Sequence, residues 1–232
     1  MNSMLKMAAA VAAAALPLTA AEVTGKVTLK GTPPPANIIA AVKADANCGK
    51  VAKGDAKTRT YVVGADGGLA NTIVYIKKGL EGKTFPVPST KPEIDQAGCM
   101  YQPYVAAVMV GQKFDVKNSD PFMHNVNATP KINKGFNFAQ ASQGQVNEKV
   151  FDKAEMGIRF ACNVHPWMIA YVSVMENPFF VVTDDKGTFA IKGDLPDGKY
   201  TLEAFHQKAG ALTQEIEVKG GKATTDFAFD VK

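Results

Sequence analysis

The 232-residue sequence has few of the residues that usually carry metal or thiol chemistry: three cysteines, three histidines and one tryptophan. It also lacks runs of lysine or arginine, and its 26 basic and 22 acidic residues nearly balance. A chain that binds nucleic acid would show a basic stripe that follows phosphates, so that class of partner is excluded. No long apolar run follows the N-terminal one, so no membrane span is expected.

The first 21 residues are typical of an export signal. Lys6 supplies the positive charge, residues 7–18 form an alanine-rich apolar stretch, and residues 19–21 are small enough for cleavage. The apolar stretch is shorter than a bilayer span requires. We therefore predict a signal peptide over residues 1–21 and a periplasmic or secreted mature protein.

Exported proteins keep their disulfides, so an odd number of cysteines needs an explanation. Cys48 and Cys99 stand in turn-like contexts beside glycine, "ANCGK" and "QAGCMY". We predict a disulfide between them, which leaves Cys162 free. A free cysteine is either a small buried apolar residue or a reactive or metal-binding group.

The pattern of apolar residues excludes long helices. Short segments rich in β-branched and aromatic residues recur between turn signals, which predicts an all-β sandwich. The predicted strands include residues 59–64, 71–79, 157–164 and 168–175. The proline-rich segments "GTPPPAN" and "FPVPSTKP" are typical of extended connectors.

A domain boundary is predicted near Asn177-Pro178. Residues 22–94 would supply N-terminal strands and connectors, residues 95–176 the metal-binding part, and residues 177–232 a small second sandwich. The stretch "VTDDKGTFAIKGDLPDGKYTLEAFH" resembles the carboxypeptidase regulatory-like, transthyretin-like module, and "VTGKVTLKG" near the N-terminus resembles the first strand of that module. This resemblance implies a binding or spacer fold in which the N-terminal strand pairs with the C-terminal part.

The segment "CNVHPWM" brings Cys162, His165 and Met168 within seven residues. Alternate residues of a strand face the same side, so Cys162 ends one apolar row and Met168 begins the next. A tight loop over residues 163–167 would then place both sulfurs at one end of the core, with His165 on the loop. His124 follows the Asp120-Pro121 turn and begins another short strand.

Two imidazoles, a thiolate and a thioether are a ligand set that suits copper. Zinc rarely accepts a thioether, and its structural sites usually contain paired cysteines. Met168 is the least specific member, because it could be an ordinary core methionine and because Met123 and Met175 are further thioethers.

The spacing of "CNVHPWM" resembles the ligand loop of amicyanin, and "MHNV" resembles the segment with the first copper histidine of that family. Residues 95–175 therefore resemble an amicyanin-like or plastocyanin-like cupredoxin, of the longer type sometimes labelled methylamine utilisation proteins. The resemblance implies a Greek-key sandwich with one type 1 copper. It also implies roles for individual residues. The copper ligands would be His124, Cys162, His165 and Met168, and Asn125 would hold the two ligand loops together. Relatives of this longer type often have histidine at the position of Tyr104, so a second metal role there is left open.

We predict an electron carrier that performs no chemistry on a substrate and is not an enzyme. Its partner would be a redox protein such as a periplasmic dehydrogenase or a cytochrome. Phe122, Pro166 and Trp167 would surround the ligand histidine and form a docking face; alternatively, Trp167 is a core residue between the two domains. His206, which has no sulfur neighbour in the sequence, is expected to be structural.

Three other functions stay open from the sequence. A copper chaperone or storage protein would favour methionine-rich or histidine-rich runs, which are absent. An enzyme would need an open coordination position on the metal for its substrate, but Met168 would fill that position in this chain. A non-redox structural or binding sandwich would leave the metal motif without a role.

Overall fold

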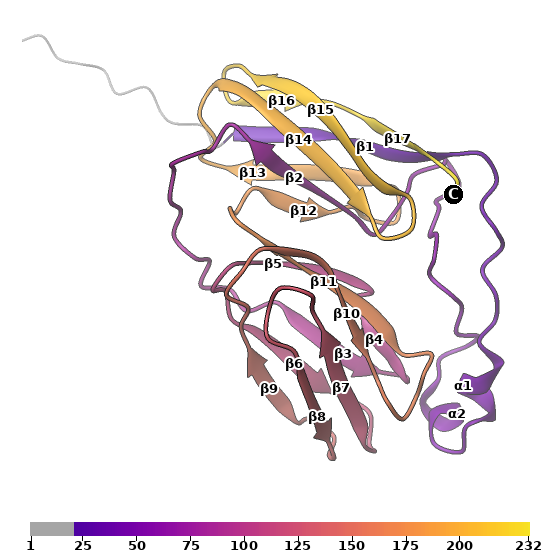
Figure 1. Ribbon diagram of the computed structural model, residues 1–232. Coiled ribbons are helices and arrows are strands. Elements are labelled where there is room, and N and C mark those ends of the chain that lie inside the picture. Colours follow the sequence, from indigo (N-terminus) through magenta and orange to yellow (C-terminus); the bar gives the residue numbers. More distant parts are fainter. Residues whose placement is uncertain (1–20) are drawn as a thin grey trace, which may run out of the picture.

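The computed structural model describes residues 21–232 and consists mainly of β-strands (Figure 1). The strands form four sheets, which pack in pairs around two hydrophobic cores. The prediction of an all-β chain with two β-sandwiches is confirmed. The predicted signal peptide lies outside the described residues except for Ala21. Within residues 21–232, no helix has the length and apolar character needed to cross a membrane.

One sandwich, here called the terminal sandwich, is built from both ends of the described chain (Figure 1). Its first sheet has the order β13-β1-β16, with β17 beside the later part of β1, and its second has the order β12-β2-β14-β15. Its strands are β1 (Ala21–Lys30), β2 (Thr72–Lys78), β12 (Phe180–Val182), β13 (Thr188–Gly193), β14 (Gly198–His206), β15 (Gly210–Val218), β16 (Lys222–Thr224) and β17 (Phe227–Asp230).

Strand β1 runs antiparallel to β13 and parallel to β16 and β17. The predicted pairing of the N-terminal strand with the C-terminal part is therefore present. Residues 177–232 do not build this sandwich alone, because β1 and β2 from the N-terminal region complete its two sheets. The buried Val23 and Val27 of β1 explain why this strand needs the C-terminal core.

The other sandwich, here called the inserted sandwich, lies between β2 and β12 in the sequence. Its sheets have the orders β5-β11-β10-β7-β8 and β4-β3-β6-β9. Its strands are β3 (Glu93–Ala97), β4 (Met100–Gln102), β5 (Val105–Met109), β6 (Phe114–Asn118), β7 (His124–Thr129), β8 (Phe136–Gln140), β9 (Val146–Lys149), β10 (Glu155–Ala161) and β11 (Ile169–Met175). A small cluster around Ile73, Val105 and Met175 joins it to the terminal sandwich.

Residues 31–63, here called the cap, leave the terminal sandwich after β1 and reach one end of the inserted sandwich (Figure 1). The cap contains the short helices α1 (Ala40–Ala44) and α2 (Cys48–Val51). Val42 and Cys48 are buried in the core of the inserted sandwich. The prediction of a strand over residues 59–64 is wrong, because no ladder forms there and only Val63 makes an isolated bridge.

Candidate metal centre

Sheet topology brings the ends of three strands together at the candidate site. Strand β10 lies between β7 and β11 and is antiparallel to both. His124 begins β7, and Cys162 directly follows the end of β10. Because neighbouring antiparallel strands run in opposite directions, the start of β7 and the end of β10 meet at the same edge.

The loop from Cys162 to Met168 is a closed hairpin connection. The last strand pair before it joins Ala161 to Ile169. Within the loop, the N–H of Cys162 donates to the carbonyl of Met168 at 3.2 Å, and the N–H of Met168 donates to the carbonyl of His165 at 2.9 Å. The tight loop that the sequence predicts is therefore present, and these bonds fix the position of His165.

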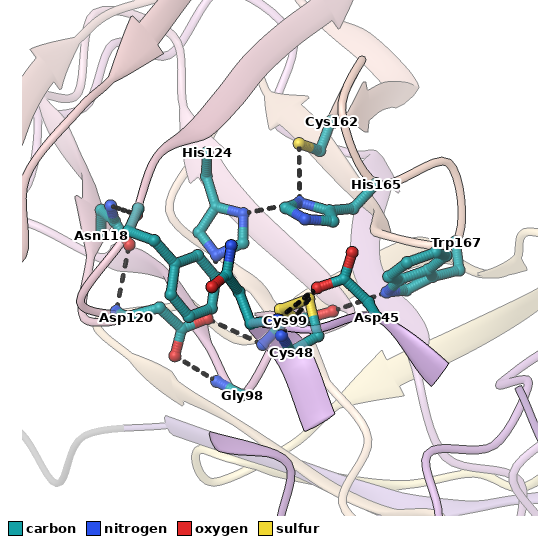
Figure 2. Close-up of a disulfide and its surroundings, with 12 residues drawn as sticks. Asp45, Cys48, Gly98, Cys99, Asn118, Asp120, His124, Cys162, His165 and Trp167 are labelled. Carbon is teal, nitrogen blue, oxygen red and sulfur yellow. Dashed lines mark hydrogen bonds and ion pairs between the residues drawn. A yellow bond between two sulfur atoms is a disulfide. The ribbon is translucent and has the colours of Figure 1, made fainter. Parts of the chain in front are cut away.

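The side chains of His124, Cys162 and His165 converge at this edge (Figure 2). The two Nδ1 atoms are 3.0 Å apart, and Cys162 Sγ lies 3.6 Å from His165 Nδ1. All three residues are buried, with relative exposures of 0%, 2% and 5%. A tetrahedral metal bonded to nitrogen at about 2.05 Å and to sulfur at about 2.3 Å would separate two nitrogens by about 3.3 Å and sulfur from nitrogen by about 3.6 Å. The three donor atoms thus fit a first-row transition metal.

Asp120 orients the first histidine. Its Oδ2 atom lies 2.9 Å from His124 Nε2. An N–H at Nε2 that donates to this carboxylate leaves the lone pair of Nδ1 directed toward Cys162 and His165. Burial lowers the pKa of His124, but Asp120 and the Cys162 thiolate outweigh it and raise that pKa overall. The sequence indicated Asp120 only as part of a turn.

Asp120 is itself held by the backbone of another loop. Its two carboxylate oxygens accept hydrogen bonds from the N–H groups of Gly98 at 2.7 Å and Cys99 at 2.8 Å. Burial raises the pKa of the carboxyl, whereas His124 and these two N–H groups lower it, and the net shift is downward. The carboxylate is therefore charged over the physiological range of pH.

The environment of Cys162 favours its thiolate. The N–H of Asn125 donates to Sγ at 3.3 Å. Burial raises the pKa of the thiol, but His124 and the backbone N–H groups around it lower that pKa below its ordinary value. A thiolate is the form that binds metals.

Asn125 links the two segments that carry the donors. Its Oδ1 atom accepts from the N–H of Asn163 at 3.2 Å, and its Nδ2 donates to the carbonyl of Phe138 at 3.0 Å. These contacts are the kind that the cupredoxin resemblance implies for Asn125.

Met168 is fully buried at the end of the ligand loop, in the same core cluster as Cys162. The ring of Phe122 lies 5.2 Å from that of His124, and the half-buried ring of Trp167 lies 5.4 Å from that of His165. Pro166 is exposed. Trp167 packs on the core of the inserted sandwich and does not lie in the cluster that joins the two sandwiches.

The disulfide between Cys48 and Cys99 is present and lies against the candidate site (Figure 2). Its sulfur atoms and a ring nitrogen of His165 all lie within 4.8 Å of one another. The carbonyl of Cys99 accepts from the indole N–H of Trp167 at 3.1 Å. The sequence predicts the disulfide but not its contact with the histidine.

Tyr104, whose role the sequence left open, and His206, which it predicts to be structural, are not among the converging donors. The ring of Tyr104 lies 4.4 Å beneath the guanidinium of Arg59, and burial raises its pKa to about 12. His206 is buried in the terminal sandwich, stacks on Tyr61 with a ring separation of 5.4 Å, and accepts the N–H of Ala209 at its Nδ1. The contacts of His206 are structural ones.

No family model and no curated protein matches the chain. Solved structures of copper proteins are similar to part of it. A reduced amicyanin variant is 19% identical and covers 44% of this chain and 97% of amicyanin, with a TM-score of 0.33. The purple cupredoxin from Nitrosopumilus maritimus is 25% identical and covers 36% of this chain and 99% of its own, with a TM-score of 0.31.

The copper-containing nitrite reductase from Thermus scotoductus SA-01 is 20% identical and covers 41% of this chain, with a TM-score of 0.33. The match spans only 24% of the length of the reductase. All of these TM-scores are below 0.5, so the assignment of a metal to this site rests on the side chains of this chain.

Proposed function

We propose that the chain is an exported type 1 copper protein that carries single electrons between redox partners. The observation that carries this proposal is the convergence of one thiol sulfur and two imidazole Nδ1 atoms in a buried cluster. A soft thiolate with two imidazoles suits copper, and copper bound there supplies one-electron exchange between Cu(II) and Cu(I). His124, Cys162 and His165 would bind the metal, with Met168 as a weak axial ligand.

The residues around the donors support electron transfer because they hold the donors in place. Asp120 fixes the ring of His124, the Asn125 N–H holds the sulfur of Cys162, and the loop hydrogen bonds position His165. Buried, hydrogen-bonded donors change little between two oxidation states of a metal. We propose a redox protein such as a periplasmic dehydrogenase or a cytochrome as partner, with no substrate turned over at the site.

The test is the visible absorption and electron paramagnetic resonance spectrum of the mature protein titrated with Cu(II). We expect an intense thiolate-to-copper band with small copper hyperfine splitting that saturates at about one copper per chain. Cys162→Ser should abolish the band. A colourless wild-type protein would reject the proposal and favour the chaperone or structural functions.

The axial ligand is tested with matched methionine variants. Met168→Leu should shift the absorption bands and the reduction potential, because the axial ligand tunes both. Met175→Leu is the control, since Met175 is also buried but lies at the far end of β11. Equal spectra for both variants would remove Met168 from the ligand set.

A further inference from the structure

The net positive charge of the described chain is concentrated in the cap. Residues 31–63 contain five basic and two acidic residues, whereas the other described residues contain twenty of each. Lys43 is paired with Asp55, and the carboxylate of Asp45 accepts the N–H groups of Asn47 and Cys48. The remaining lysines of the cap are exposed: Lys50, Lys53 and Lys57. The cap is therefore a basic patch on an otherwise balanced surface.

The cap that carries these lysines contacts the candidate metal centre through Cys48, and Lys57 lines a hollow together with Trp167. The disulfide of Cys48 brings helix α2 within 4.8 Å of a ring nitrogen of His165 (Figure 2). Farther along the cap, the guanidinium of Arg59 donates to the carbonyls of Tyr101 at 2.9 Å and Ile169 at 3.2 Å. The cap is thus fixed to the inserted sandwich at two points, the disulfide and the hydrogen bonds of Arg59.

A hollow of about 300 Å³ lies between the cap and the ligand loop. Lys57 and Arg59 line it from the cap, and Trp167 and Tyr104 line it from the inserted sandwich. Burial lowers the pKa of Arg59 to about 10, so the guanidinium stays charged at neutral pH. Trp167 therefore contacts a ligand histidine on one side and a basic, partly apolar hollow on the other.

We propose that the cap and this hollow form the docking surface for a redox protein with an acidic patch, with Trp167 as the contact nearest the metal. The use of this surface for electron transfer rests on the proposed function. Charge complementarity favours an acidic partner, because the net positive charge of the described residues lies in the cap and would orient an acidic patch there. At physiological ionic strength such attraction acts over about 8 Å, so the lysines must lie close to the contact.

The experiment compares two charge-reversal variants that change the net charge equally. The cap variant carries Lys50→Glu, Lys53→Glu and Lys57→Glu. The matched control carries Lys186→Glu, Lys208→Glu and Lys222→Glu, at exposed positions of the terminal sandwich.

The first readout uses the copper-free protein and a hexaglutamate peptide at low salt. Trp167 is the only tryptophan, so its indole N–H gives a single resonance in the ¹⁵N spectrum. We expect the peptide to shift this resonance and the amides of residues 40–59 in the wild type and in the control variant, and to leave them unchanged in the cap variant. Equal shifts in both variants, or none in the wild type, would overturn the proposal.

The second readout uses the copper-loaded protein and two inorganic reductants of opposite charge. Reduction of the copper by the anion hexacyanoferrate(II) should be about tenfold slower in the cap variant than in the control. Reduction by the cation hexaammineruthenium(II) should be faster in the cap variant. Both differences should disappear at 0.5 M salt, because salt screens the charges. Equal rates in the two variants would overturn the proposal.

A third arm separates a protein partner from a membrane surface. Tighter binding to vesicles of phosphatidylglycerol than to the peptide, lost in the cap variant, would assign the patch to a membrane and overturn the proposal. Peptide binding at the cap of a chain that takes up no copper would support the acidic partner and refute the copper carrier.

Discussion

Replacing Asp120 should weaken metal binding more than any other change outside the donors. The carboxylate is buried and accepts three hydrogen bonds, from the N–H groups of Gly98 and Cys99 and from His124 Nε2. Asp120→Ala would leave these donors unpaired, and each buried unpaired donor costs about 1–3 kcal/mol. We expect a loss of at least about 3 kcal/mol in the free energy of unfolding. Loss of the orienting partner of His124 should weaken copper affinity by about 10–100-fold.

Asp120→Asn is the second variant, because it keeps one oxygen acceptor and has nearly the same size. Its unfolding free energy should fall by about 1–3 kcal/mol, while its copper affinity falls almost as far as that of the alanine variant. Urea unfolding of the copper-free protein and competition with a chelator measure the two quantities. The matched control is Asp197→Ala, because Asp197 also accepts two backbone N–H groups but lies in the terminal sandwich. Unchanged copper affinity in both Asp120 variants would refute the role assigned to this residue.

Three further predictions concern stability. Burial lowers the pKa of His206 from 6.5 to about 4, so the unfolded chain binds a proton first and the free energy of unfolding falls as the pH falls from 6.5 to 4. Over that range the wild type should lose about 3 kcal/mol more than His206→Asn does. Urea unfolding of both proteins at pH 7 and pH 4 measures the difference. Removing the disulfide with Cys48→Ala and Cys99→Ala should lower the free energy of unfolding by about 4 kcal/mol, because its cysteines are 51 residues apart and the bond restricts the unfolded chain. An unchanged urea midpoint would contradict this prediction. Phe160→Ala should lower the free energy of unfolding by about 3–5 kcal/mol, since the buried ring of Phe160 packs on three other phenylalanines. Val146→Ala, at an exposed position, should lower it by less than about 0.5 kcal/mol. Equal losses for the two variants in thermal unfolding would contradict this prediction.

The sequence predicts the ligand loop well because its signal is local. Apolar residues alternate up to Cys162 and again from Met168, and the structure buries both rows in one core. Residues 163–167 are too few to form anything but a short connection between two paired strands. The fold class follows from the same alternation, which recurs along most of the described chain.

Other elements escape prediction where burial is weak or where residues are packed without a ladder. Strand β9 is short and polar, and β8 is a five-residue strand without β-branched residues in which only Gln140 is fully buried. Residues 59–64 show the opposite case. Tyr61 is buried against His206 and its hydroxyl reaches the backbone of Lys232, so these β-favouring residues are packed without pairing as a strand.

The surroundings of the donors could not be predicted from one sequence, because the contacts join distant segments. Trp167 and Cys99 are separated by 68 residues, and Arg59 and Ile169 by 110. The role of Asp120 was hidden because an aspartate before proline is already explained as a turn. No local spacing distinguishes a turn aspartate from one that binds a histidine.

The way these distant segments meet favours an electron carrier over a metal chaperone. Asp120 is bound to the backbone beside Cys99, Cys99 is joined to the cap by the disulfide, and its carbonyl accepts from Trp167 next to His165. His124, through Asp120, and the loop of His165, through Trp167, are therefore both bound to one unit that the disulfide cross-links. A chaperone must open its donors to release the metal, and moving His124 or the loop of His165 here would break buried hydrogen bonds. An electron carrier keeps its metal and needs donors that stay in place between two oxidation states, which this cross-linked unit provides.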